Sequence, residues 1–156
     1  MKPIIIANWK MQLNYRESMQ LAEKLKAELP ENYLAGREVV LCPSFSSLLL
    51  VGEMIRESNI KLGSQDIFWA DKGAFTGAES PQFLFDAGCR YSIVGHSERR
   101  TNLAETDEIA KKKISGALAV GLTPILCVGE TRAERESGRT DAVIISQVQK
   151  GLADID

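Results

Sequence analysis

A histidine stands at the end of an apolar run in this chain, and it is the only histidine among the 156 residues. The surrounding stretch, residues 91–100, reads Tyr-Ser-Ile-Val-Gly-His-Ser-Glu-Arg-Arg. A buried strand that stops this abruptly usually ends at a rim where backbone amides and polar side chains meet solvent or a ligand. His96 is therefore the first candidate for a residue that does chemistry.

Polar side chains that could join His96 follow three other strand-like runs: Asn8 and Lys10, then Gln65 and Asp66, and finally Glu130. In folds built from parallel strands, ligands gather at the carboxyl ends of those strands. One face would thus collect an ammonium, an amide, an imidazole and several carboxylates. Such a set suits a small anionic substrate with a polarisable carbonyl or hydroxyl.

Strand-like and helical patterns alternate along the chain. Five apolar runs are typical of buried strands: residues 4–7, 39–42, 60–63, 91–94 and 124–128. Between and after them, apolar residues recur at helical spacing, in the sets Leu21, Ala22, Leu25 and Leu29; Phe83, Leu84 and Ala87; Ala110, Ile114, Ala117 and Leu118; and Ile145, Val148 and Leu152. Ser80 before Pro81 predicts one helix start, and Thr106 predicts another.

This alternation predicts an α/β fold with a parallel sheet that is buried on both faces. Two architectures fit five βα units of this size: an open doubly wound sheet, or an incomplete (β/α)8 barrel. Periodicity does not separate them. A doubly wound nucleotide binder often has a glycine-rich turn after its first strand, and residues 8–11, Asn-Trp-Lys-Met, are unlike one.

Length and composition favour a single globular domain over residues 1–156. A net charge of −2 gives no support to nucleic-acid binding, and no apolar stretch approaches the roughly 18 residues of a membrane span. Three cysteines without a C-x-x-C pair make a disulfide framework or a zinc site unexpected, which favours the cytoplasm. The basic run 111–113 is expected on the solvent face of a helix.

Four short motifs resemble triosephosphate isomerase, in that family's order and at its spacing: Asn8-Trp9-Lys10-Met11, Gly73-Ala74-Phe75-Thr76-Gly77, Val94-Gly95-His96-Ser97-Glu98-Arg99-Arg100 and Cys127-Val128-Gly129-Glu130-Thr131. The resemblance covers essentially the whole chain but only about the first five-eighths of the family's chain. It implies a TIM barrel, of which about five of the eight βα units are present.

The resemblance also implies roles for single residues. Lys10 would bind the substrate phosphate, and Asn8 would orient the substrate. His96 would be a neutral electrophile that hydrogen-bonds the substrate oxygens, with the free amides of a helix that opens at Ser97 facing its ring. Glu98 would keep Lys10 in place through a buried ion pair.

The connection from Trp69 to Ser80 is apolar, which suggests a partner surface. In the family, the matching loop inserts into a neighbouring subunit, so Phe75, Thr76 and Gly77 would lie at the interface of a homodimer. This chain has Ala78 where the family usually has glutamate. That difference puts in doubt the usual ion pair between subunits at Arg99.

The function implied by the resemblance is the interconversion of dihydroxyacetone phosphate and glyceraldehyde 3-phosphate in glycolysis and gluconeogenesis, without a metal or an organic cofactor. The family's general-base glutamate follows the sixth strand and is not among these 156 residues, so the chain alone is expected to be inactive. With two unpaired strand edges, it is also expected to be marginally stable and to associate. The alternative is a non-catalytic fragment that acts only by association or complementation.

Overall fold

Five strands alternate with helices in the computed structural model, which describes residues 2–155. In chain order the elements are β1 (Ile4–Asn8), α1 (Tyr15–Glu28), α2 (Glu31–Leu34), β2 (Glu38–Cys42), α3 (Phe45–Ile55), β3 (Lys61–Ser64), α4 (Pro81–Asp86), β4 (Cys89–Val94), α5 (Ser97–Leu103), α6 (Asp107–Ala119), β5 (Thr123–Leu126), α7 (Arg132–Glu136) and α8 (Thr140–Gly151). Each predicted strand is confirmed within about two residues. The sequence pattern did not single out α2, α3 and α7.

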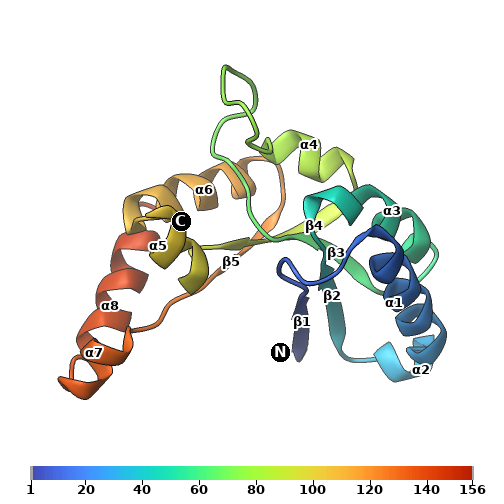
Figure 1. Ribbon diagram of the computed structural model, residues 1–156, viewed down its shortest axis with the longest axis horizontal. Helices are drawn as coiled ribbons and strands as arrows, with labels where there is room; N and C mark the ends of the chain where they lie inside the picture. The colour runs from blue at the N-terminus through green and yellow to red at the C-terminus, as the bar shows by residue number, and fades with distance from the viewer. Residues whose placement is uncertain (1, 156) are drawn as a thin grey trace.

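The order of the strands separates the two candidate architectures. All neighbouring strands are parallel, and their order is β1-β2-β3-β4-β5. A doubly wound sheet reverses its strand order at a switch point, whereas a (β/α)8 barrel keeps the order of the sequence. The helices also follow the convex side of an arched sheet (Figure 1). The chain therefore folds as a curled half-barrel, and the doubly wound alternative is excluded.

Alternation along the strands builds two separate apolar clusters. Val39 and Leu41 of β2 belong to the large cluster between sheet and helices, while Val40 and Cys42 belong to a small one with Ile93 of β4. Successive side chains of a strand point to opposite faces, so the small cluster lies on the concave side. Burial in both clusters fixes the register of the central strands and thus the positions of their carboxyl ends.

The predicted helix caps are confirmed. The Ser80 hydroxyl accepts a hydrogen bond from the Phe83 amide at 3.3 Å, and the Thr106 hydroxyl accepts one from the Ile109 amide at 3.3 Å. The buried stripe predicted for α6 is wrong at Leu118, which is 45% exposed. One residue along a helix turns by about 100°, so Leu118 faces away from the side on which its neighbour Ala117 is buried.

The sheet ends in two strands that each have one neighbour within residues 2–155, β1 and β5. Consequently the apolar residues of β1 are accessible: Ile4 is 49% exposed, Ile5 55% and Ile6 38%. Ile145 of α8 is 55% exposed on the other side of the arch. Figure 1 shows these two flanks on either side of the open, concave face.

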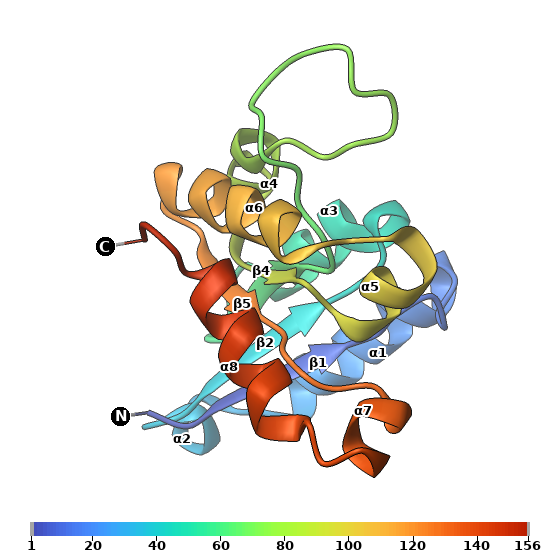
Figure 2. The same cartoon turned by 90° about the vertical axis from the view of Figure 1, so that its left-hand side faces the viewer.

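The connection between β3 and α4 projects far from the rest of the chain, as both ribbon views show (Figures 1 and 2). Its base is aromatic: the rings of Phe68 and Trp69 stack with centroids 3.8 Å apart, and Phe75 lies 4.5 Å from Phe68. Phe75 nevertheless remains 45% exposed. The projecting segment keeps an apolar surface accessible to solvent.

Candidate active site

Most of the polar residues that follow the strands meet in one cleft of about 460 Å³, but Glu130 is not among its lining residues. In Figure 2 the arrows of β1 and β2 point toward α5. The cleft is lined by residues that follow β1 and by residues of α5, so it lies at this end of the sheet. Its lining includes the main candidates from the sequence: Asn8, Lys10, Gln65, Asp66, His96 and Glu98. Lys10 and His96 thus face one small volume, on elements that are far apart in the chain.

Size alone does not single out this cleft. Two others, of about 350 and 430 Å³, lie at the amino ends of the strands. Their linings share Lys61 and contain surface carboxylates and cations, without the chain's histidine. The carboxyl-end cleft is the candidate site because of its chemistry.

Lys10 has an unusual backbone conformation. Its φ is +54°, in the left-handed region that side chains other than glycine rarely adopt. Two side chains hold it there: the Lys10 amide donates to Oδ1 of Asn8 at 2.9 Å, and Nε2 of Gln65 donates to the Lys10 carbonyl at 2.9 Å. The same Gln65 nitrogen lies 2.9 Å from the Cys42 carbonyl at the end of β2. Gln65 therefore ties the turn after β1 to the neighbouring strand.

The ammonium of Lys10 pairs with Glu98. Its Nζ lies 2.8 Å from Oε1, and the two side chains are 46% and 51% exposed. The expectation of a buried ion pair is therefore wrong: both side chains line the cleft and remain about half exposed. The hydrogen bond from Lys10, together with its charge, holds the pKa of Glu98 below its usual range.

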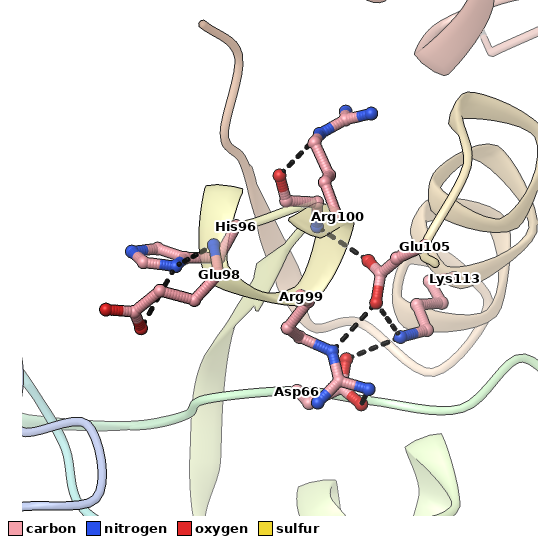
Figure 3. A network of polar contacts seen from close by, with 8 residues as sticks. Asp66, His96, Glu98, Arg99, Arg100, Glu105 and Lys113 are labelled. Carbon is pink, nitrogen blue, oxygen red and sulfur yellow. Dashed lines mark hydrogen bonds and ion pairs between the residues drawn. The ribbon is translucent and has the colours of Figure 1, made fainter. Parts of the chain in front are cut away.

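α5 begins at Ser97, as expected, and His96 occupies its N-cap position. Its Nδ1 accepts a hydrogen bond from the Glu98 amide at 3.3 Å, and Oε2 of Glu98 lies 3.5 Å from the same nitrogen. An amide can donate only to a ring nitrogen that carries no proton, so this contact leaves the N–H on Nε2. Figure 3 shows this second nitrogen on the side of the ring away from α5.

Behind His96 lies a network of largely buried charges formed by Asp66, Arg99, Glu105 and Lys113 (Figure 3). The sequence analysis did not predict this network. Glu105 accepts from the Gly95 amide at 2.8 Å, from Nε of Arg99 at 2.8 Å and from Nζ of Lys113 at 2.6 Å. Asp66 pairs with the same two cations, at 2.7 Å to Arg99 and 2.6 Å to Lys113. The side chains of Lys113 and Glu105 are only 4% and 2% exposed.

Burial and ion pairing shift the pKa values of Asp66 and Glu105 in opposite directions. Burial raises the pKa of Asp66 above its usual value, although Lys113 and Arg99 oppose this. Burial also acts to raise the pKa of Glu105, but the hydrogen bonds from Lys113, Arg99 and the Gly95 amide hold it below its usual value. Glu105 thus stays ionised directly behind the residue that precedes His96.

The prediction that residues 111–113 form a solvent face is wrong for Lys113. Ala110, Ile114 and Ala117 are buried on α6, and position 113 is three residues from the first of them and four from the last. Helical spacing alone therefore predicts Lys113 on the buried side of α6. The prediction of a solvent face relied on the charge of residues 111–113 instead. No comparable pattern pointed to Glu105.

The residues expected at a subunit interface lie away from the cleft. Thr76 and Gly77 line a further cleft of about 330 Å³ between the projecting connection and α6. Arg99, whose usual partner across the interface was in doubt, pairs with Asp66 and Glu105 of its own chain. A role of Phe75, Thr76 and Gly77 in an interface stays a prediction.

Glu130 and Cys127, from the fourth motif, have surroundings that suit a structural role. Glu130 lies 2.9 Å from Arg135 and is mostly buried, and burial raises the pKa of Cys127. Among residues 2–155, no three His, Cys, Asp or Glu side chains are grouped so that they could hold a metal ion. In the same range, no helix is long and apolar enough to cross a bilayer.

Comparison with known proteins agrees with this geometry. The model of the family named "Triosephosphate isomerase" matches residues 3–156. The triosephosphate isomerase of Picosynechococcus sp. is 46% identical over an alignment of 157 positions, which covers 100% of this chain and 65% of the relative. That of Thermoanaerobacter pseudethanolicus is 45% identical over 151 residues, 97% of this chain and 60% of the relative.

A solved structure shows the same correspondence. The crystal structure of triosephosphate isomerase from Bartonella henselae has a TM-score of 0.92 and 33% identity, and it is matched over 100% of this chain and 64% of its own. The chain thus spans about 60–65% of the length of these relatives. With its half-barrel, its four motifs and a family match that leaves out only the first two residues, the chain belongs to the triosephosphate isomerase family.

Proposed function

We propose that the carboxyl-end cleft binds a phosphorylated triose and serves the interconversion of dihydroxyacetone phosphate and glyceraldehyde 3-phosphate, in the cytoplasm and as a homodimer, without metal or organic cofactor. One observation carries the proposal: Glu98 contacts both key groups, since its Oε1 accepts from Nζ of Lys10 at 2.8 Å and its backbone amide donates to Nδ1 of His96 at 3.3 Å. A cation and an imidazole are thus held by one residue at one cleft.

Lys10 supplies the charge that a phosphate dianion needs. The ammonium has three N–H donors, and Glu98 accepts from one of them. The side chain is 46% exposed, so an anion can reach the other donors from solvent. The left-handed turn held by Asn8 and Gln65 keeps this donor at the cleft rim.

His96 supplies a fixed hydrogen-bond donor. With Nδ1 occupied by the Glu98 amide, Nε2–H is the group that remains for a substrate oxygen. When a proton leaves the carbon next to a carbonyl, negative charge develops on oxygen, and a donor already in place stabilises that charge most. This is the chemistry of an enediolate-type isomerisation.

The described residues offer no suitable base for the proton abstraction. Glu98 is held ionised by Lys10, which makes it a weak base. Asp66 is engaged with Lys113 and Arg99. We therefore assign the general base to the part of the family's chain that this chain does not match, and we expect the 156-residue chain alone to be inactive.

A fusion tests both halves of the proposal. Residues 1–156 are joined to the C-terminal third of the Picosynechococcus relative, and isomerisation is measured in protein from a host without its own enzyme. The fusion should turn over the triose phosphates, whereas the isolated chain should show no activity, because a missing base typically costs about 10² to 10⁴ in rate.

Two variants of the fusion locate the site. His96→Ala should lower kcat by roughly 10²- to 10³-fold, the usual effect of losing one donor to a developing oxyanion. Lys10→Ala should raise KM and lower kcat/KM, while Lys24→Ala, at an exposed lysine of α1, should do neither. Turnover by the isolated chain, or a fully active His96→Ala fusion, would refute the proposal.

A role through association alone is the second candidate, favoured by the exposed residues Ile4 to Ile6 of β1. It predicts that the 156-residue chain binds a separately produced C-terminal segment of the relative. Measurable binding without recovery of isomerase activity would favour this candidate over the first.

A further inference from the structure

Arg100, the second arginine of the His-Ser-Glu-Arg-Arg motif, has no part in the chemistry described above, yet all three nitrogens of its guanidinium donate hydrogen bonds. Nε donates to the Gly95 carbonyl at 2.7 Å, Nη1 to Oδ1 of Asp107 at 2.6 Å, and Nη2 to the Cys127 carbonyl at 3.4 Å. The side chains of Arg100 and Asp107 are 17% and 14% exposed. This group therefore joins α5, α6 and the ends of two strands.

The guanidinium of Arg100 links β4 and β5 by hydrogen bonds just beyond the end of the sheet. The last backbone bond between these strands runs from the Cys127 amide to the Val94 carbonyl at 2.8 Å. The next carbonyls, those of Gly95 and Cys127, both accept from Arg100 instead. Arg100 thus sets the spacing of the two strand ends at the point where the cleft begins.

Gly95 is the residue through which Arg100 acts on His96. Its φ is +72°, and a Cβ at this position would lie 3.0 Å from Nη2 of Arg100 and 3.2 Å from the Cys127 carbonyl. Both polar backbone groups of Gly95 are held by charged side chains, the carbonyl by Arg100 and the amide by Glu105. The residue directly before His96 is therefore fixed from two sides.

We propose that Arg100 is a positioning residue for His96: by holding the Gly95 and Cys127 carbonyls with one planar guanidinium, it sets the backbone from which the imidazole enters the cleft. The proposal rests on the proposed function for its catalytic meaning, but the positioning itself can be measured without turnover. Lysine cannot replace arginine here, because a single ammonium lacks the planar fork that reaches three acceptors in fixed directions.

The test uses His96 as a spectroscopic reporter, since it is the only histidine. Long-range proton–nitrogen correlation of the ¹⁵N-labelled 156-residue chain gives separate signals for Nδ1 and Nε2. In the unmodified chain these should be the signals of a single tautomer protonated on Nε2. In Arg100→Lys and Arg100→Gln they should move toward each other as the ring samples other orientations and tautomers.

Lys150→Gln is the matched control. Its Nζ lies 4.0 Å from Oδ2 of Asp107, so the substitution removes a cation beside the same carboxylate without touching a strand end. The His96 signals should not change in this variant. Unchanged His96 signals in Arg100→Lys would overturn the proposal, and so would loss of the folded state in that variant, since the guanidinium would then hold the fold and not the ring.

Kinetics of the fusion give the second readout. Arg100→Lys should lower kcat by roughly 10- to 100-fold with KM nearly unchanged, because small displacements of a catalytic group have effects of this size while Lys10 still binds the phosphate. An equal fall of kcat in Lys150→Gln would contradict the proposal. If the unmodified fusion proves inactive, the proposed function fails, whereas the nitrogen signals still decide the role of Arg100.

Discussion

Nζ of Lys10 lies 2.8 Å from Oε1 of Glu98, although 88 residues separate the two in the sequence. The contact joins the turn after β1 to the first turn of α5, across β2 and β3. Only the curvature of the sheet allows this, because the two parent strands are separated by two others. The same curvature places Lys10 and His96 at one cleft.

The pH dependence of this ion pair is the first prediction. Because the pKa of Glu98 is lowered in the folded state, the pair is present above the usual glutamate value of about 4.3 and is lost as the pH falls through the lowered value. Carboxyl ¹³C signals should show Glu98 titrating below 4.3. Lys10→Met should return the midpoint to the usual value, and Lys24→Met, at an exposed lysine, should leave it shifted.

The strands and most long helices could be predicted because burial repeats with the period of each element. Val39 to Cys42 are apolar on both faces, and Ser80 and Thr106 mark helix starts through hydrogen bonds within four residues. Such signals are local. Lys10 and His96 could be named because they follow predicted strands, and the resemblance to a known family added their expected roles. The half-exposed state of Lys10 and Glu98 depended on distant elements.

The buried charge network could not be predicted because its members satisfy one another only in three dimensions. Lys113 and Glu105 look solvated in the sequence, since each alone is a charged residue that is rarely buried. Asp66 follows β3 and is 47 residues before Lys113 in the sequence. The left-handed conformation of Lys10 had no signal either, because lysine is not a residue that indicates it.

Removing Lys113 should destabilise the chain strongly. Lys113→Met leaves Glu105 and Asp66 without their shared ammonium, and breaking a buried pair typically costs about 3–5 kcal/mol of unfolding free energy. Lys112→Met is the control on the same helix, where the ammonium lies 5.5 Å from the centre of the Trp69 ring and about 1 kcal/mol or less should be lost. Urea denaturation measures both, and equal losses would show that the network does not stabilise the fold.

The left-handed backbone of Lys10 is strained, so a substitution that relieves this strain should raise the free energy of unfolding relative to one that keeps it. A left-handed residue other than glycine costs about 1–2 kcal/mol, and methionine at position 10 keeps this strain while glycine relieves it. Lys10→Gly should therefore unfold with a free energy about 1 kcal/mol higher than Lys10→Met. Within α1 the order should reverse: Lys26→Gly should be about 1 kcal/mol less stable than Lys26→Met. The same order at both positions would contradict the strain.

The exposed edge strand predicts self-association of the 156-residue chain. Ile5 is 55% exposed on β1, which has only β2 as a neighbour within the described residues, and an apolar unpaired edge is a template for pairing. Sedimentation velocity over a range of concentrations should show association, and Ile5→Thr should weaken it while keeping a residue suited to strands. Leu49→Gln removes a side chain of similar size that is 66% exposed on α3, and it should have no effect. A chain that stays monomeric at every concentration, or equal effects of the two substitutions, would show that the edge of β1 does not drive association.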